Sequence, residues 1–411
     1  INKLSNQTEM LFQIAWRNLF RNRLRSFVIM GAITLGITLG IFMLAFSWGL
    51  MDQRGRDIID TQIAHVQVHQ SGFSLEDSAE LVIQNASKVL ATLEQQESVL
   101  AVSARTLRTG MVASTRKSLG VLIRGIDPQA EAAVTTIAQK MVQGDFFTKK
   151  GRNSIIIGEN LAEELGVKLR SKITLTFYRN DGEITAGAFR VAGTFKTAAS
   201  PFDKGNVFVK QSDLQRLMGD EAVVHEIALR LTESELAEPT KKKIQASLPS
   251  YDTKYWGDVQ PTLKLMNEQF NLSVAIFMGI IIFALLFGIL NTMLMAVLER
   301  KKELGMLMAV GMKRYQIFGM IMIETIMLSM IGAAIGLLIG YGVVSWFGVQ
   351  GINLGMMKEG LSSMGMADMV YTKLEFPYYV QTTVMMVLAA IIAAIPPSIK
   401  ALKLNPVEAI H

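Results

Sequence analysis

Two histidines four residues apart, His65 and His69, have a spacing that could do chemistry. On a helix, such a pair can bind one zinc ion. The surrounding residues AHVQVH (64–69) alternate between polar and apolar, which is typical of a strand. Four residues of strand span about 13 Å, too far for two ligands that must each lie about 2 Å from one ion. We therefore predict a polar strand face here rather than a zinc site.

The sequence carries no motif of a known catalytic constellation. It contains no GxxxxGK[ST] phosphate loop, no HExxH and no GxSxG. It also has no cysteine, which excludes disulfides, thiolate metal sites and cysteine nucleophiles. We expect no catalytic residue, no bound metal and no cofactor, and this chain would not hydrolyse ATP through a phosphate loop.

A charged, glycine-punctuated segment, ERKKELGMLMAVGMKR (299–314), separates two long apolar runs. On a helix, an apolar stripe would follow the i, i+3, i+4, i+7 pattern, with Arg300 and Glu303 on the opposite side. Gly311, just before two basic residues, predicts the end of that helix. The helix could transmit force from a soluble protein, or the segment could be a loop that only fixes topology. The predicted stripe is Leu304, Leu307, Met308 and Gly311.

Four long apolar stretches indicate a membrane protein. Half of the 411 residues are hydrophobic and only 18% are charged, whereas a soluble domain has about 25% charge. Each stretch exceeds the roughly 20 residues that span a bilayer. The predicted transmembrane helices are 27–50, 271–298, 315–350 and 376–397, and the first is expected to stay as an anchor rather than to be cleaved as a signal peptide.

Basic residues set the expected orientation. Arginines precede the first span, five basic residues lie in or beside 299–314, and lysines follow the fourth span. The positive-inside rule places these regions and both termini in the cytoplasm. Because these flanks account for most of the net charge of +6, that charge does not indicate nucleic-acid binding.

Within the spans, small residues and one carboxylate stand out. Gly36 and Gly40 in the first span, and a glycine series at 332, 336 and 340 in the third, have the spacing of close helix contacts. Glu324 is the one carboxylate of the third span. It could relay protons, but its place near Arg314 favours a structural role near the membrane interface.

The segment between the first two spans predicts a folded α/β domain. Strand-like alternation at 64–69, 121–126, 172–177 and 206–210 is interleaved with helical patterns at 78–96, 160–166 and 212–219. The expected fold is an α-helical membrane protein with four transmembrane helices and a large mixed α/β extracytoplasmic domain between helices 1 and 2. Outside the four spans, the predicted parts are an amphipathic N-terminal helix (1–26), the α/β domain (51–270), the 299–314 helix, a loop (351–375) and a tail (398–411).

The sequence resembles the permease subunits of MacB/FtsX-type (type VII) ABC transporters. The segment 299–314 is similar to the family's charged segment after the second span, and MIETIMLSMIGAAIGLLIGYG (322–342) to its third span. The ending IPPSIKALKLNPVEAI (395–410) is similar to the family's ending, with Pro406, Glu408 and Ala409 in place. VLIRGIDP (121–128) and residues 155–175 resemble its periplasmic core. The resemblance covers nearly the whole chain in order.

The resemblance implies a non-catalytic subunit of a bacterial inner-membrane transporter. Such permeases pair with a second copy or a paralogue and bind two copies of an ATPase, which here would be separate and would hold ATP and Mg²⁺. A coupling helix relays closure of the ATPase through the spans to the periplasmic domain, which is called mechanotransmission. The residues assigned to this contact are Glu299, Arg300, Lys302, Glu303, Leu304, Leu307, Met308 and Gly311.

Within the family, the sequence is most like the lipoprotein-releasing Lol-type permeases, through residues 191–219 and the loop between spans three and four. The implied job is to extract acylated lipoproteins from the outer leaflet and pass them to a periplasmic carrier. Alternatives are a MacB-like tripartite efflux or peptide export permease and an FtsX-like regulator of a periplasmic enzyme. Lipid chains need an apolar cavity, and its expected walls are Phe42, Met43, Phe46 and Met51 on one side and Phe277 and Ile280 on the other.

Overall fold

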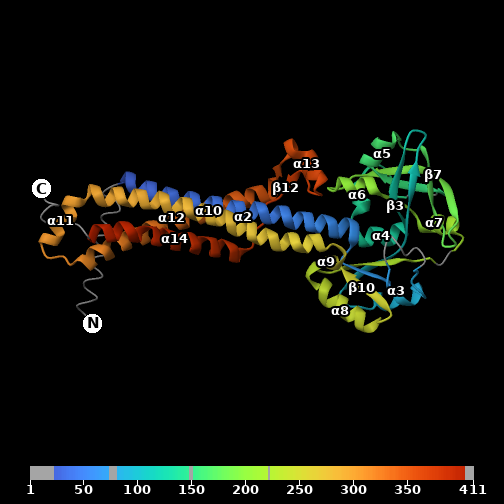
Figure 1. Cartoon of the computed structure of the whole chain (residues 1–411), viewed down its shortest axis with the longest axis horizontal. Helices are drawn as coiled ribbons and strands as arrows, with labels where there is room; N and C mark the ends of the chain where they lie inside the picture. The colour runs from blue at the N-terminus through green and yellow to red at the C-terminus, as the bar shows by residue number, and fades with distance from the viewer. Residues whose placement is uncertain (1–22, 74–80, 148–150, 221–222, 403–411) are drawn as a thin grey trace. The chain divides into compact units, whose positions relative to one another are not determined.

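The computed structural model describes residues 23–73, 81–147, 151–220 and 223–402 (Figure 1). The predicted N-terminal helix up to residue 22 and the tail from residue 403 lie outside these ranges. The chain divides into two compact units, which are described separately. The membrane unit comprises Ile1–Leu50, Glu268–Ile352 and Val370–His411, and the extracytoplasmic unit comprises Met51–Asn267 and Asn353–Met369.

Four helices of the described chain are long and apolar enough to cross a membrane, as the hydropathy predicts. Two of them run well beyond the predicted spans, because α2 continues past Leu50 and α10 begins before residue 271. The long helices are α2 (Arg23–Ile58), α10 (Pro261–Glu299), α12 (Arg314–Gln350) and α14 (Phe376–Leu402). A short helix, α11 (Lys301–Ala309), connects α10 to α12.

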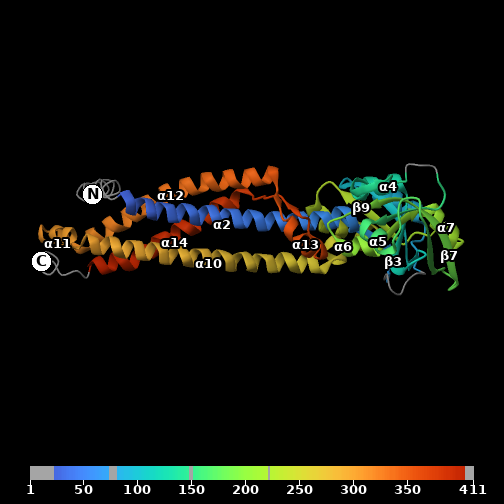
Figure 2. The ribbon, with the colours of Figure 1, turned by 90° about the horizontal axis from the view of Figure 1, so that it is seen from above.

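The glycine series of the third span lies against the first span of the same chain, where α2 and α12 run side by side (Figure 2). A side chain added at Gly336 would meet Ile37 and the carbonyl oxygen of Thr34 at 3.0 Å. The hydroxyls of Thr34 and Thr38 donate across this contact to the carbonyls of Gly332 and Gly336, at 3.0 and 3.2 Å. The predicted close helix contact is confirmed, and its partner is α2.

The extracytoplasmic unit is built on one ten-stranded sheet, part of which closes on itself. Strand β6 pairs with both β2 and β7, so that β2, β3, β8, β5, β7 and β6 form a closed ring. Its interior is filled by aliphatic and aromatic side chains such as Ile123, Ile157 and Phe189. The ring strands are β2 (Val99–Ala113), β3 (Ser118–Ile126), β5 (Ser154–Gly158), β6 (Lys172–Tyr178), β7 (Ile184–Phe195) and β8 (Asn206–Lys210), with β4 (Met141–Gly144) paired to β7.

The long strand β2 also belongs to a second lobe. Its first half pairs with β9, and the order continues through β1 to the edge strand β10. One face packs Val66, Val68 and Ile227 against the helices α3 and α8. The other face lies against α4, through Ala64, Ala228 and Val134. The elements of this lobe are β1 (Val66–Gln70), α3 (Ala86–Glu94), α4 (Pro128–Val134), β9 (Glu226–Leu231), α8 (Ala237–Ser247) and β10 (Tyr251–Tyr255).

The strands predicted from alternation are present as β1, β3, β6 and β8, and the helices predicted near 160–166 and 212–219 are α5 (Glu159–Leu165) and α7 (Gln211–Met218). The helix predicted over 78–96 is wrong at its start, because α3 begins only at Ala86. The preceding Asn85 has a left-handed backbone conformation. The backbone N–H of Ile83 donates to the carbonyl of Val224 at 2.8 Å. An extended contact at Ile83 therefore replaces the part of the expected helix just before Asn85.

The segment 353–369, between α12 and α14, completes the extracytoplasmic unit. The Gln53 side chain donates to the carbonyl of Met369 at 2.9 Å, and Gly365 lies close to Ala199. Helix α13 (Lys358–Ser363) of this segment, together with α5 and α6 (Ser200–Gly205), lines a polar cleft of about 690 Å³. Residues far apart in the sequence thus form one wall of the domain.

Candidate functional site

Helix α11 sits at one end of the helical bundle, between α10 and α12 (Figure 1). The chain leaves α10 at Glu299, and Arg300 caps the start of α11 with its carbonyl, which accepts from the N–H of Leu304 at 2.9 Å. Gly311 ends the helix with φ +105°, and its N–H donates to the carbonyl of Met308. Only glycine adopts this backbone without strain, so the predicted helix end is confirmed.

The predicted apolar stripe of α11 faces the bundle rather than outward. Leu304 is 3% exposed and belongs to the hydrophobic core of the membrane unit, and Leu307 and Met308 pack against that core. Leu304 is therefore not an exposed docking residue, whereas contact of the partly buried Leu307 and Met308 with an ATPase stays a prediction. The physical reason is that the ends of the spans are themselves apolar and are stabilised by burial, and the apolar stripe of α11 is the nearest surface that can bury them.

A different stripe of α11 is exposed. Met306 is 54% exposed and Val310 is 88% exposed, and Lys302 precedes Met306 by one helical turn. These three residues, at i, i+4 and i+8, share one face of the helix. Glu299 and Gly311 are also exposed at its ends. A partner that reaches this end of the bundle would meet two large apolar side chains and a lysine.

A buried ion pair ties the start of α11 to the third span. The Arg300 guanidinium lies 3.4 Å from a carboxylate oxygen of Glu324 on α12, and 3.9 Å from Glu303 on α11. The Glu324 side chain is 3% exposed and that of Arg300 is 13% exposed. Arg300 was predicted on the outer, polar side of the helix and instead turns inward. The structural role favoured for Glu324 now has a partner, namely the residue that begins α11.

The residues expected to wall a lipid cavity lie on helices α2 and α10. Phe42 stacks on Phe46 and lies 5.9 Å, centroid to centroid, from Phe347 of α12. Phe277 and Ile280 are exposed on α10. Met43 is half-buried on α2, and Met51 belongs to the extracytoplasmic unit. Their role in holding acyl chains stays a prediction.

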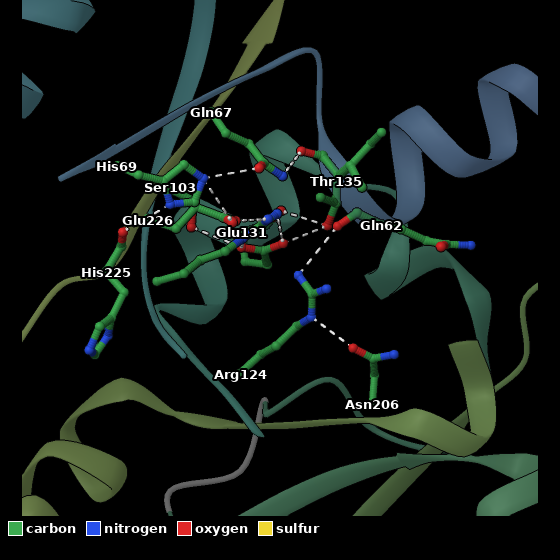
Figure 3. Close-up of polar contacts among 12 residues, drawn as sticks. Gln62, Gln67, His69, Ser103, Arg124, Glu131, Thr135, Asn206, His225 and Glu226 are labelled. Atoms are coloured by element: carbon green, nitrogen blue, oxygen red, sulfur yellow. Dashed lines mark hydrogen bonds and ion pairs between the residues drawn. The ribbon is translucent and has the colours of Figure 1, made fainter. Parts of the chain in front are cut away.

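The extracytoplasmic unit contains a cluster of buried charges between α4 and the β1–β9–β2 sheet (Figure 3). Arg105 on β2 is at its centre. Its Nε and Nη2 donate to both carboxylate oxygens of Glu131 at 2.9 and 2.7 Å, and its Nη1 donates to Glu226 at 2.6 Å. Ser103 and Thr135 also donate to Glu131. Every acceptor of the Glu131 carboxylate is thus used, which a buried charge requires.

The ion pairs determine the charge states of this cluster. Burial alone would lower the pKa of Arg105 and raise the pKa of Glu131 and of Glu226. The opposite charges reverse these effects, so that Arg105 lowers the pKa of both carboxyls and they raise the pKa of Arg105. All three groups are therefore charged near neutral pH. Neighbouring Arg124 feels mainly burial and then Arg105, which together lower its pKa to about 10.

His69 extends the cluster toward the start of β1. Its Nδ1 lies 3.1 Å from the carbonyl of His225, its Nε2 lies 3.1 Å from Gln67 Oε1, and its ring stacks on Phe73. Burial lowers the pKa of His69, although Glu226 partly offsets this. His69 lies in strand β1, as predicted, whereas His65 lies immediately before the strand, and both side chains are buried. Within the described residues, no group of three or more His, Cys, Asp or Glu side chains could hold a metal ion.

Arg105, Glu131, Glu226 and His225 were not among the residues predicted from the sequence. A signal exists in β2, where AVSARTL (101–107) alternates and places Ser103 and Arg105 on the same side as Ala101. An arginine at an inward strand position requires buried carboxylate partners. Those partners are on α4 and β9, which are distant in sequence, so only the fold brings them together.

Two family models match the chain. The MacB-like periplasmic core domain matches residues 26–247, and the FtsX-like permease C-terminal model matches residues 275–406. The lipoprotein-releasing system transmembrane protein LolC of Xylella fastidiosa (strain 9a5c) is 23% identical over 407 residues, covering 95% of each chain. LolC of Neisseria meningitidis serogroup B is 24% identical over 411 residues, again covering 95% of each. The macrolide export ATP-binding/permease protein MacB of Burkholderia cenocepacia is 19% identical over 344 residues, covering 82% of this chain and 50% of that protein.

Proposed function

Since this chain belongs to the MacB/FtsX-type family of ABC transporter permeases, we propose that it is the non-catalytic membrane subunit of an ATP-driven transporter that extracts acylated lipoproteins from the bacterial inner membrane. Its likeness to two lipoprotein-releasing proteins over 95% of each chain supports the substrate class. Its extracytoplasmic unit would then face the periplasm and both termini the cytoplasm, in line with the positive-inside rule.

The observation that carries the coupling mechanism is the exposed stripe of α11. A separate ATPase, two copies per transporter, binds ATP and Mg²⁺ and contacts Lys302, Met306 and Val310. Methionine is enriched at protein interfaces, and Met306 and Val310 are 54% and 88% exposed. Since Arg300 starts α11 and pairs with Glu324 on α12, movement of the docked helix reaches the third span directly.

The work required is the transfer of acyl chains out of the bilayer, at about 0.8 kcal/mol for each CH₂ group. The exposed aromatic and aliphatic side chains of α10, including Phe277 and Ile280, offer a surface for those chains. A second permease copy or a paralogue facing this surface would enclose those chains. The released lipoprotein would pass to a periplasmic carrier.

A second candidate is export of small molecules or peptides in the manner of MacB. It is supported by the match of the MacB-like core model over residues 26–247. An FtsX-like regulator of a periplasmic enzyme is a third possibility, supported by the C-terminal match alone. The three differ in what binds the extracytoplasmic unit, which is a lipoprotein carrier, an adaptor of an outer-membrane duct, or an enzyme.

The test is to purify the full chain with its native partners and to identify them by mass spectrometry. We expect an ABC ATPase and lipid-anchored proteins. Met306→Glu and Val310→Glu should remove the ATPase, because they place charge in an apolar contact, whereas Met356→Glu, at an exposed methionine of the 353–369 segment, should not. An adaptor or a cell-wall enzyme in place of lipoproteins would overturn the substrate, and retention of the ATPase by both α11 variants would overturn the docking surface.

A further inference from the structure

Helix α2 does not pass directly into strand β1. Its last residues are followed by a five-residue π-helix, Ile59–Ile63, and then by Ala64 with φ +64° and ψ −179°. Only glycine adopts this region of backbone conformation readily, so an alanine there is strained. π-Helical turns are rare and are frequent at functional sites. We call residues Ile59–Ala64 the junction.

Contacts from other elements hold the junction in this conformation. The N–H of Thr136 donates to the carbonyl of Asp60 at 2.8 Å, and the hydroxyls of Thr61 and Thr136 lie 3.1 Å apart. On the other side, the N–H of Ala64 closes the π-turn onto Ile59 at 2.7 Å. Since α4 ends just before Thr136, the turn is fixed to the segment that follows this helix.

The same junction is bonded to the buried charge cluster. Gln67 Nε2 donates to the carbonyl of Ile63 at 2.8 Å, and Gln67 Oε1 faces His69, which lies 3.7 Å from Glu226. Arg124 donates to the carbonyl of Gln62 at 3.4 Å (Figure 3). The Ile63 carbonyl is therefore held by Gln67, which is bonded to His69 beside Glu226. The Gln62 carbonyl is held by Arg124, which also donates to Asn206 at 3.0 Å and lies in the field of the cluster's charges.

We propose that the junction is a strained latch between the first span and the sheet, held closed by the Arg105–Glu131–Glu226 cluster through Gln67, Arg124 and the segment after α4. Opening the latch lets Ala64 leave the left-handed region and lets the π-turn relax. The strained backbone and its clamps thus give the junction two discrete arrangements rather than a continuous range. This inference rests on the proposed function in one respect, because ATP-driven movement of α2 is what would open the latch.

The first test measures strain without any partner. Hydrogen exchange of peptides covering 59–66 is followed in the purified full chain and in Ala64→Gly. Glycine removes the backbone strain of position 64 in the closed state, so hydrogen exchange at the junction should slow by about tenfold. Asn153→Gly, at another residue with positive φ in the same unit, is the matched control and should leave the junction unchanged. Unchanged or faster exchange in Ala64→Gly would overturn the latch.

The second test uses the absence of cysteine from the sequence. Thr61→Cys with Thr136→Cys should form a disulfide across the junction, because the two hydroxyls are 3.1 Å apart. Ser98→Cys with Thr240→Cys is the control, since these hydroxyls are 3.0 Å apart within the second lobe. In the complex purified with its native ATPase, ATP and Mg²⁺ should speed exchange at the junction in the reduced protein and in the control. The oxidised junction pair should abolish this response, and reductant should restore it.

The outcomes separate the two proposals. A response to ATP that survives the oxidised junction pair would overturn the latch and leave the proposed function intact. An absence of any response in the reduced protein would overturn the ATP-driven function, and the Ala64→Gly result would then decide whether the strained latch exists.

Discussion

Two buried arginine–carboxylate pairs, one in each unit, are built differently. In the extracytoplasmic unit, Arg105 binds Glu131 through two parallel hydrogen bonds of 2.9 and 2.7 Å and adds a third bond to Glu226. In the membrane unit, an Arg300 nitrogen lies 3.4 Å from Glu324, and its Nε lies 3.9 Å from Glu303. Both carboxylate side chains are almost fully buried, so burial does not distinguish the two pairs.

The difference lies in how strongly geometry fixes each pair. A two-pronged arginine–carboxylate pair holds both groups in one orientation, whereas the longer contacts of Arg300 impose less geometric specificity. We infer that the Arg105 cluster fixes the position of α4 on its sheet, and that the Arg300–Glu324 contact allows α11 to adjust against α12. This placement would suit the coupling mechanism proposed above.

The largest expected effect comes from breaking the rigid pair. Glu131→Gln leaves Arg105 with only one carboxylate, and removing one partner of a buried ion pair costs about 3–5 kcal/mol. We expect that loss in the unfolding free energy of the extracytoplasmic unit, measured by hydrogen exchange of β2 and β9 peptides in the full chain under increasing denaturant. A loss below about 1 kcal/mol would contradict the rigidity assigned to this cluster.

A third buried carboxylate, Asp203, is hydrogen-bonded to a threonine, and it shows how such a group affects stability when it accepts hydrogen bonds from an uncharged residue. Asp203 accepts hydrogen bonds from the N–H and hydroxyl of Thr197, and burial raises its pKa to about 7. Because the folded state binds this proton more tightly than the unfolded state, the contribution is fully present below about pH 4 and is lost as the pH rises through 7. A shift of three units corresponds to about 4 kcal/mol at most.

The thermal stability of the extracytoplasmic unit should therefore fall between pH 5 and pH 8. The Asp203→Asn substitution should remove most of that fall. The Glu131 and Glu226 carboxyls, whose pKa values are lowered, have the opposite sign. Their contribution is present above the pKa of unfolded glutamate and is lost on acidification. An Asp203→Asn protein with the same slope between pH 5 and pH 8 would refute the assignment.

The adjustable pair should matter less for stability and more for coupling. Arg300→Gln or Glu324→Gln should lower the thermal stability of the membrane unit by about 1 kcal/mol, between the values for exposed and for rigid buried pairs. ATP hydrolysis by the bound ATPase should continue while its stimulation of substrate release falls. A stability loss as large as that of Glu131→Gln would show that the two pairs are equivalent.

An exposed pair gives the smallest effect and serves as the baseline. Lys242 and Glu238 on α8 are 2.9 Å apart and mostly exposed. Lys242→Gln should change the unfolding free energy by no more than about 0.5 kcal/mol, because such pairs are screened by solvent. A larger change would mean that distance, rather than burial and orientation, sets the strength of ion pairs in this unit.

Much of the fold could be predicted because each element carries its own pattern. Uncharged runs identify the four long helices, and period-two alternation identifies β1, β3, β6 and β8. The close contact of the third span follows from three glycines one turn apart. The closed ring of strands could not be predicted, because β6 pairs with β2 and β7 through contacts that leave no local signal.

The candidate site was predicted in place but not in detail. The charged segment and Gly311 correctly indicated a short helix between two spans. Periodicity shows that α11 has an apolar stripe, but it does not show what covers that stripe, so the inward direction of Leu304 was missed. The Arg105 cluster joins β2, α4 and β9, and a single sequence gives no sign of such distant pairing.

The extracytoplasmic unit is built from two separate segments of the chain, and this sets an order of events during synthesis. Residues 51–267 leave the ribosome well before the segment 353–369, and the third membrane helix is made between them. The hydrogen bond from Gln53 to Met369 and the cleft wall supplied by α13 can therefore form only after the segment 353–369 has been made. The domain reaches its final form only after the third span has been inserted, so its maturation reports that membrane assembly is nearly complete.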